Sequence, residues 1–164
     1  QNLYTLTDDS VKLINNLKQD VTLYVLSAEN SADDTVVRTL ENYEDESSHI
    51  KVEYVDPAVS PNFYSSYTDA APSDGSIIVV SGEKSKVIDA SDLYEYSVDY
   101  STYTQTKSAY DGEGQLTSAI SYVTGDSQPK VYVITGHGES SLDSGFQSAL
   151  EKMNIAVEEL ILLQ

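Results

Sequence analysis

Apolar positions recur along this chain with two periods, one typical of helices and one typical of strands. Helical spacing predicts a helix after Thr7, a second one capped by Ser31 or Asp33, and a short one around Phe63, Tyr64 and Tyr67. The same spacing predicts helices over 112–125 and 142–153. Short apolar or alternating runs predict strands at 21–27, 50–55, 76–80, 86–88, 131–135 and 157–163.

Two connections stand out between these elements. Gly82, Glu83 and Lys84 separate the strands at 76–80 and 86–88, which predicts a hairpin. Residues 91–111 lack a clear period, and we interpret them as a long connection with room for a short strand or one helical turn. Connections of this length are often functional or face a partner.

The order of elements predicts an α/β protein. Strand, helix, strand, short helix, strand and hairpin follow one another as in a thioredoxin-like fold, in which helices sandwich a mixed sheet. We therefore expect a thioredoxin-like domain over 1–126. Residues 127–164 form a strand–helix–strand unit, which opens a second α/β unit or extends the first sheet. Such a unit cannot bury both faces of its strands alone, so we expect the chain to be a piece of a longer protein.

Composition excludes several classes of function. The net charge of −18 repels nucleic-acid phosphates and anionic membrane surfaces, so we expect no nucleic-acid partner. The chain has no cysteine, which removes thiolate catalysis and thiol–disulfide exchange. No apolar run approaches the ~18 residues of a membrane span. We predict no cofactor.

One candidate site follows the strand at 131–135. Gly136, His137, Gly138 and Glu139 lie between this strand and the next helix, where α/β sheets place ligands, and the glycines would let an anion approach the backbone. A turn in which the histidine bonds to backbone explains the same residues. A metal site needs three or four ligands, and only His137 and Glu139 are close in sequence, so we predict no metal.

A second candidate is a cluster of tyrosines. The chain has 13 Tyr against 2 Phe and no Trp. Several of these rings crowd the connection at 91–111, where they would form a platform for a sugar or a protein partner or seal an irregular segment. The candidate residues are Tyr94, Tyr96, Tyr100 and Tyr103.

Six segments in order resemble a known family. They are LTDDS at 6–10, VTLYVL at 21–26, VEYVDP at 52–57, SIIVVSG at 76–82, GEGQLTSAI at 112–120 and VITGHGE at 133–139. Together they look like the extracytoplasmic region of GldG-like auxiliary proteins of ABC transporters, the group named after gliding-motility transporters. The resemblance implies a thioredoxin-like first part and, from about Pro129, the start of an amidotransferase-like α/β domain. It brings no catalytic residues.

The resemblance also implies a cellular setting. Its members are partners of an ABC permease and its ATPase, and membrane helices that flank the soluble region hold them at the extracytoplasmic face of the bacterial membrane. We therefore expect a non-enzymatic domain that acts through protein or ligand contacts. An oligomer is compatible with this expectation. Two alternatives stay open: a hydrolase that uses His137 and Glu139, with or without a metal, and a cell-surface carbohydrate-binding module that uses the tyrosines between Tyr94 and Tyr110.

Overall fold

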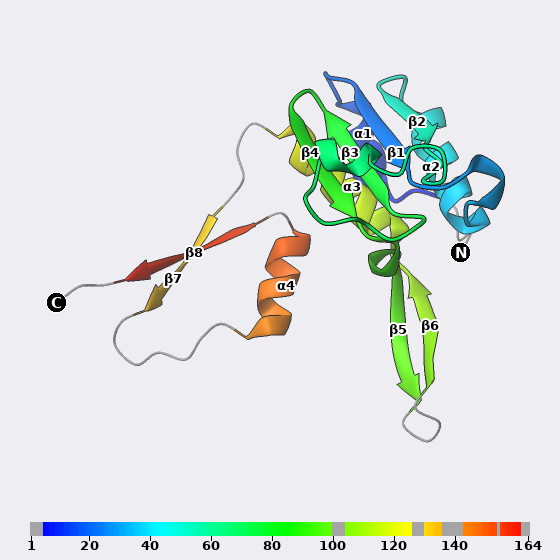
Figure 1. The fold of residues 1–164 in the computed structure, drawn as a ribbon. Helices are drawn as coiled ribbons and strands as arrows, with labels where there is room; N and C mark the ends of the chain where they lie inside the picture. The colour runs from blue at the N-terminus through cyan, green and yellow to red at the C-terminus, as the bar shows by residue number, and fades with distance from the viewer. Residues whose placement is uncertain (1–4, 100–103, 126–129, 136–142, 154, 162–164) are drawn as a thin grey trace. The chain divides into compact units, whose positions relative to one another are not determined.

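The structure is a computed structural model that describes residues 5–99, 104–125, 130–135, 143–153 and 155–161 (Figure 1). Contacts within the chain divide it into two compact units, Gln1–Thr124 and Gly125–Gln164. Among the helices of the described residues, none combines the length and the apolar character that a membrane span requires.

A four-stranded mixed sheet forms the centre of the first unit. Its strands are β1 (Val21–Val25), β2 (Ile50–Tyr54), β3 (Ile77–Ser81) and β4 (Lys84–Ile88), in the order β2-β1-β3-β4. β1 and β2 run parallel, whereas β3 is antiparallel to both β1 and β4. The predicted hairpin is confirmed, and Gly82 supplies the positive φ of 57° that its turn requires.

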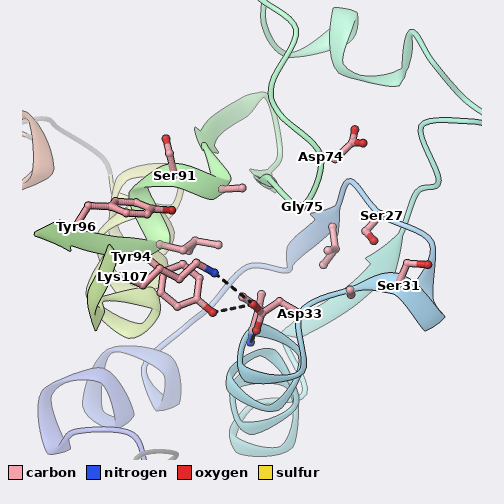
Figure 2. A pocket seen from close by; sticks show the side chains of 14 residues that line it. Ser27, Ser31, Asp33, Asp74, Gly75, Ser91, Tyr94, Tyr96 and Lys107 are labelled. Carbon is pink, nitrogen blue, oxygen red and sulfur yellow. Dashed lines mark hydrogen bonds and ion pairs between the residues drawn. The ribbon is translucent and has the colours of Figure 1, made fainter. Parts of the chain in front are cut away.

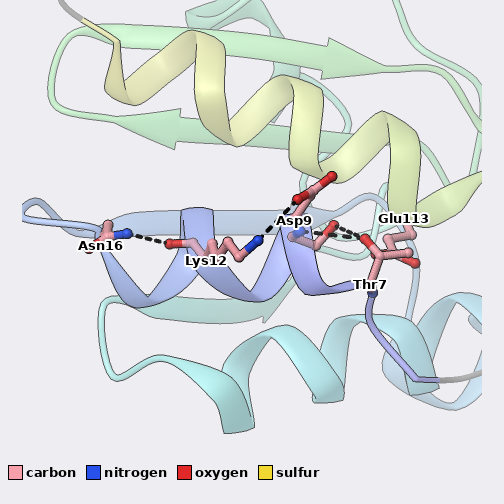
Figure 3. A network of polar contacts seen from close by, with 6 residues as sticks. Thr7, Asp9, Lys12, Asn16 and Glu113 are labelled. Atoms are coloured by element: carbon pink, nitrogen blue, oxygen red, sulfur yellow. Dashed lines mark hydrogen bonds and ion pairs between the residues drawn. The ribbon is translucent and has the colours of Figure 1, made fainter.

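Three α-helices accompany this sheet: α1 (Asp8–Asn15), α2 (Asp34–Glu46) and α3 (Gly112–Thr124). Thr7 caps α1, because its side chain accepts a hydrogen bond from the Ser10 amide. Asp33 caps α2 by accepting from the Thr35 and Val36 amides, which decides between the two caps that the sequence allowed. Figure 3 shows a second contact at the start of α1, where Glu113 of α3 accepts hydrogen bonds from the amide and the hydroxyl of Thr7, both at 2.7 Å.

The core lies on one face of the sheet. Alternate residues of each strand point to this face, and all three α-helices bury their apolar sides there. The fully buried side chains of this core include Ile14, Leu23, Leu40, Tyr43, Ile77, Val79, Leu116 and Ile120.

A short 3-10 helix, η2 (Phe63–Ser66), covers the opposite face of the sheet. The Tyr24 ring of β1 meets the Phe63 ring edge-on, with centroids 4.9 Å apart, and Tyr67 packs beside both rings. In the described part of the chain the sheet therefore has α-helices on one face and this 3-10 helix on the other.

The interpretation of residues 91–111 as a connection is wrong. They contain the end of η3 (Ala90–Leu93), followed by β5 (Tyr94–Asp99) and β6 (Thr104–Tyr110), which pair as an antiparallel hairpin. The hairpin projects from the body of the first unit (Figure 1). All side chains of β6 before Tyr110 are exposed, so this strand has no buried face that would impose an alternating apolar pattern.

The second unit contains β7 (Lys130–Thr135), α4 (Ser144–Lys152) and β8 (Ala156–Ile161). β7 and β8 run parallel, and the predicted order of strand, helix and strand is confirmed. Leu150 is buried, as the helical pattern indicated. Phe146 and Met153, which the same pattern placed on the apolar side, are 55% and 67% exposed within the described structure.

Candidate binding cleft

A cleft of about 370 Å³ lies at one edge of the four-stranded sheet in the first unit. β1 and β4 end at this edge and β3 begins there, so three backbone segments and the start of α2 converge on it. Ligand sites of α/β proteins commonly lie beyond the carboxyl ends of strands. Figure 2 shows the cleft, which is lined by Val25, Ser27, Ser31, Ala32, Asp33, Val36, Asp74, Gly75, Ala90, Ser91, Leu93, Tyr94, Tyr96 and Lys107.

Asp33 joins the start of α2 to the β5–β6 hairpin. Its Oδ1 accepts from the Thr35 amide at 2.9 Å, while its Oδ2 accepts from the Tyr94 hydroxyl at 2.8 Å and lies 3.9 Å from the Lys107 ammonium (Figure 2). Burial alone would raise the pKa of Asp33, but the hydrogen bonds from Tyr94 and from the two amides, together with the charge of Lys107, outweigh it and lower the pKa. Asp33 is therefore an anion at neutral pH.

Tyr94 anchors the base of the hairpin. Its ring packs against Tyr110 with centroids 5.2 Å apart, and the Tyr110 hydroxyl donates to Thr39 Oγ1 at 3.0 Å. Burial and the hydrogen bond to Asp33 raise the pKa of Tyr94 to about 12, so its hydroxyl keeps its proton at any physiological pH. Tyr96, two residues further along β5, is 45% exposed at the mouth of the cleft.

Asp89 supports the part of the cleft wall that Ser91 lines. Its carboxylate accepts from the amide and hydroxyl of Ser73, from the Ser76 hydroxyl, and from the amide and hydroxyl of Ser91. These bonds hold the segment before β3, which includes Gly75 at a φ of 84°, against the start of η3. The bond from the Ser91 amide is the largest of the effects that hold the pKa of Asp89 well below its ordinary value, and they outweigh its partial burial.

This carboxylate makes the first unit sensitive to acid. Because the folded-state pKa of Asp89 is depressed, its contribution to stability is present above the unfolded-state pKa of about 4 and is lost as the pH falls below it. We expect Asp89→Asn to cost about 1 kcal/mol of unfolding free energy at pH 7, because the side-chain nitrogen of Asn cannot accept the hydrogen bonds that one carboxylate oxygen takes, and less at pH 3. Urea unfolding followed through the β3 amide signals at both pH values measures this. An equal difference between variant and wild type at the two pH values would contradict it.

The structure brings together two of the residues that the sequence singled out. Tyr94 and Tyr96 line the cleft. Tyr100, Tyr103, Gly136, His137, Gly138 and Glu139 lie outside the described residues. His49 lies at the other edge of the sheet, where its Nδ1 is 2.9 Å from Asp20 Oδ1. Within the described ranges no three acidic or histidine side chains are grouped closely enough to hold a metal ion.

Several cleft residues escaped the sequence analysis. The sequence pattern predicts Ser31 and Asp33 as alternative caps of a helix and assigns no ligand contact to either. Lys107 lies in the region interpreted as a connection. The sequence position of Asp33 could have indicated a ligand contact, because this residue follows the carboxyl end of a buried strand. Ligands of α/β sheets are expected at that place.

Comparison with protein families finds a match over the first part of the chain. The model of a domain of unknown function, DUF7088, matches residues 1–92, which is more than half of the 164 residues. This range includes the walls of the cleft formed by Ser27, Asp33, Asp74 and Ser91 and ends before the β5–β6 hairpin. Curated proteins and solved structures give no match. The chain belongs to the DUF7088 family.

Proposed function

We propose that the first unit is a non-enzymatic binding domain that acts through its cleft, in an auxiliary protein of an ABC-type transport system. The observation that carries this proposal is the cleft at the carboxyl ends of β1 and β4. Two of its charged groups, Asp33 and Lys107, already engage each other and Tyr94. A carboxylate with a lowered pKa is a weak general base, because such a base works best with a pKa near the operating pH.

The sheet supports a thioredoxin-like assignment. Its order β2-β1-β3-β4, with a parallel pair and a terminal antiparallel hairpin, agrees with the sequence of elements from which we expected that fold. In a redox member of that fold the reactive thiol would follow the first strand. Here the segment between β1 and α2 carries Ser27 and Ser31 and borders the cleft. We propose that the cleft, which lies where a redox member of this fold would hold its thiol, serves here to contact a partner.

The resemblance to GldG-like proteins supplies the setting of the proposal. It favours a permease and its ATPase as partners, a position at the extracytoplasmic face of the bacterial membrane, and anchoring by segments beyond this chain. On the same resemblance, β7, α4 and β8 would open an amidotransferase-like second domain.

A photo-crosslinking experiment tests this function. A photoreactive phenylalanine analogue replaces Ser31 at the cleft of the full-length protein in its own cells, and the same analogue replaces Glu83 in the turn at the far end of β3 and β4 as the matched control. We expect a light-dependent adduct with a transporter subunit from position 31 and none from position 83. Adducts that contain no permease or ATPase, from a protein that is produced and folded, would contradict the proposal.

A further inference from the structure

Four hydroxyl groups around the cleft donate their hydrogen bonds to other groups of the protein. Ser27 Oγ donates to the Ala28 carbonyl at 2.9 Å, and Ser91 Oγ donates to Asp89 Oδ1 at 2.8 Å. Ser31 Oγ donates to the side-chain oxygen of Asn30 at 3.3 Å, and the Tyr94 hydroxyl donates to Asp33. Carbonyl and carboxylate oxygens only accept, so the direction of these bonds is fixed by chemistry. What these four hydroxyls still offer to a ligand is their lone pairs.

The carboxylates extend this pattern. Asp33 keeps 42% of its side chain exposed, and Asp74 is exposed on the wall of the cleft beside Gly75. Among the described residues the Asp74 carboxylate makes no hydrogen bond or ion pair. A carboxylate is purely an acceptor when ionised. The polar side chains of the cleft are therefore dominated by acceptors, with the Lys107 ammonium as the charged donor among the lining residues and the Tyr96 hydroxyl able to act either way.

Lys107 shows how a cation lies in this setting. Its ammonium is 3.7 Å from the centroid of the Tyr94 ring and 3.9 Å from Asp33 Oδ2. A cation over an aromatic face beside a carboxylate is a favourable arrangement. The Lys107 side chain is nevertheless 54% exposed, and an exposed ion pair is worth little. An incoming cation could therefore displace it at small cost.

We propose that the cleft binds the side chain of a lysine or arginine presented by a partner protein, and that Lys107 is an internal competitor for that position. The ammonium or guanidinium would take hydrogen bonds to Asp33, Asp74 and the serine hydroxyls. Its aliphatic stem would lie on the apolar floor, which is formed by Val25, Val36 and Leu93. This proposal rests on the proposed function, because it names what the contact domain recognises.

Charge and size favour this occupant. A chain with a net charge of −18 attracts a basic partner and repels an acidic one. A volume of about 370 Å³ lies at the small end of the range of roughly 300–1,000 Å³ for ligand sites, which suits one side chain. A sugar presents hydroxyls that need donors as well as acceptors, and an anionic ligand would face both Asp33 and Asp74.

A titration of the full chain tests the ligand class. The probes are N-acetyl-lysine methylamide, N-acetyl-arginine methylamide and the uncharged analogue N-acetyl-norleucine methylamide, followed through the amide signals of Gly75 and Ser91. We expect saturable shifts with the two cationic probes, weakening as salt is added, and none with norleucine. Equal shifts from norleucine or glucose would overturn the proposal. Tighter binding of the free diamine putrescine than of either blocked amino acid would overturn the choice of a protein partner.

Three variants and one control locate the binding. Asn caps a helix as well as Asp, so Asp33→Asn keeps α2 and is expected to weaken lysine binding about tenfold, the loss typical of a hydrogen bond to a charged group. Asp74→Asn alters an exposed side chain and is expected to weaken binding about threefold, and Lys107→Met to tighten it about threefold to tenfold by removing the competitor. Glu83→Gln is the control for the two aspartate variants, because it also removes one negative charge but lies at the far end of the sheet. It is expected to leave the affinity unchanged.

The outcomes separate this inference from the proposed function. Crosslinks to a transporter subunit from position 31, with no binding of either cationic probe, would remove the ligand class and keep the function. Binding of the cationic probes that follows the expected order of variants, with no transporter subunit in the crosslinks, would keep the ligand class and remove the transport setting. If Lys107→Met weakens binding, Lys107 is no competitor and that part of the proposal falls.

Discussion

Replacing Leu23 with alanine is expected to lower the unfolding free energy of the first unit by about 3 kcal/mol, the typical cost of a leucine deleted from a packed core. Leu23 is fully buried in β1, which pairs with strands on both sides. Its register partners are Val52 of β2 and Val79 of β3, and Val79 belongs to the same buried core. A cavity at this position therefore has walls that cannot easily collapse.

The measurement is urea unfolding followed by the amide signals of β1 and β3, which report on the first unit alone. Val59→Ala is the control, because Val59 is 79% exposed and surface changes usually stay within about 0.5 kcal/mol. A loss below about 1 kcal/mol for the Leu23 variant would mean that this side of the sheet is not the principal core.

The central sheet could be predicted because burial left a clear record in the sequence. Leu23 lies on the buried face of β1 and alternates with half-buried neighbours, and α2 repeats its buried residues at helical spacing from Val36 to Tyr43. Both patterns exist because one side of each element packs on the core. The strand–helix–strand order of the second unit was readable for the same reason.

The β5–β6 hairpin could not be predicted from such a record. β6 is exposed from Thr104 to Ala109, so its pattern of side chains is free of the two-residue period that burial imposes. A shift of register between Glu95 and Tyr96 disturbs β5 in addition. The remaining signal was its content of Thr and Tyr, residues that favour strands, and this signal alone is weak.

The cleft was partly foreseen for a related reason. The high tyrosine content of the chain indicated Tyr94 and Tyr96 as candidate residues. The position of Asp33 before a helix, in contrast, was enough to explain that residue as a cap. The structure shows that the two carboxylate oxygens of Asp33 have separate partners: Oδ1 caps α2, and Oδ2 meets Tyr94 and Lys107. The cap explains Oδ1 from the local sequence. The contacts of Oδ2 join residues far apart in the sequence, so only the folded structure could reveal them.

A chain of hydrogen bonds ties the core helices together around Tyr43. The Tyr43 hydroxyl donates to the Glu113 carbonyl at 3.1 Å and lies 2.6 Å from Thr117 Oγ1, which in turn lies 2.8 Å from Ser10 Oγ. Because the Tyr43 hydroxyl donates its one proton to the carbonyl, the Thr117 hydroxyl donates to Tyr43, and the Ser10 hydroxyl donates to Thr117. α1, α2 and α3 thus meet in one buried network, and burial raises the pKa of Tyr43 well above its ordinary value.

This network makes the first unit sensitive to alkali. Above about pH 10 the unfolded chain loses the Tyr43 proton and the folded chain keeps it, so the folded state loses about 1.4 kcal/mol of relative stability for each further pH unit. We expect Tyr43→Phe to be less stable than the wild type by about 1 kcal/mol at pH 7, because the Glu113 carbonyl loses its donor. Its unfolding free energy should fall less steeply above pH 10, so the two curves cross at about pH 11.

Thr117→Val is the matched control for this crossing. It breaks the same network but leaves the Tyr43 hydroxyl in place, so it should lower the whole curve of unfolding free energy against pH and keep the steep fall above pH 10. Urea unfolding at pH 7, 9, 10 and 11, followed through the amide signals of α3, gives all three curves. Parallel curves for Tyr43→Phe and the wild type would mean that Tyr43 ionises as readily in the folded chain as in the unfolded one, and that the three helices do not enclose it.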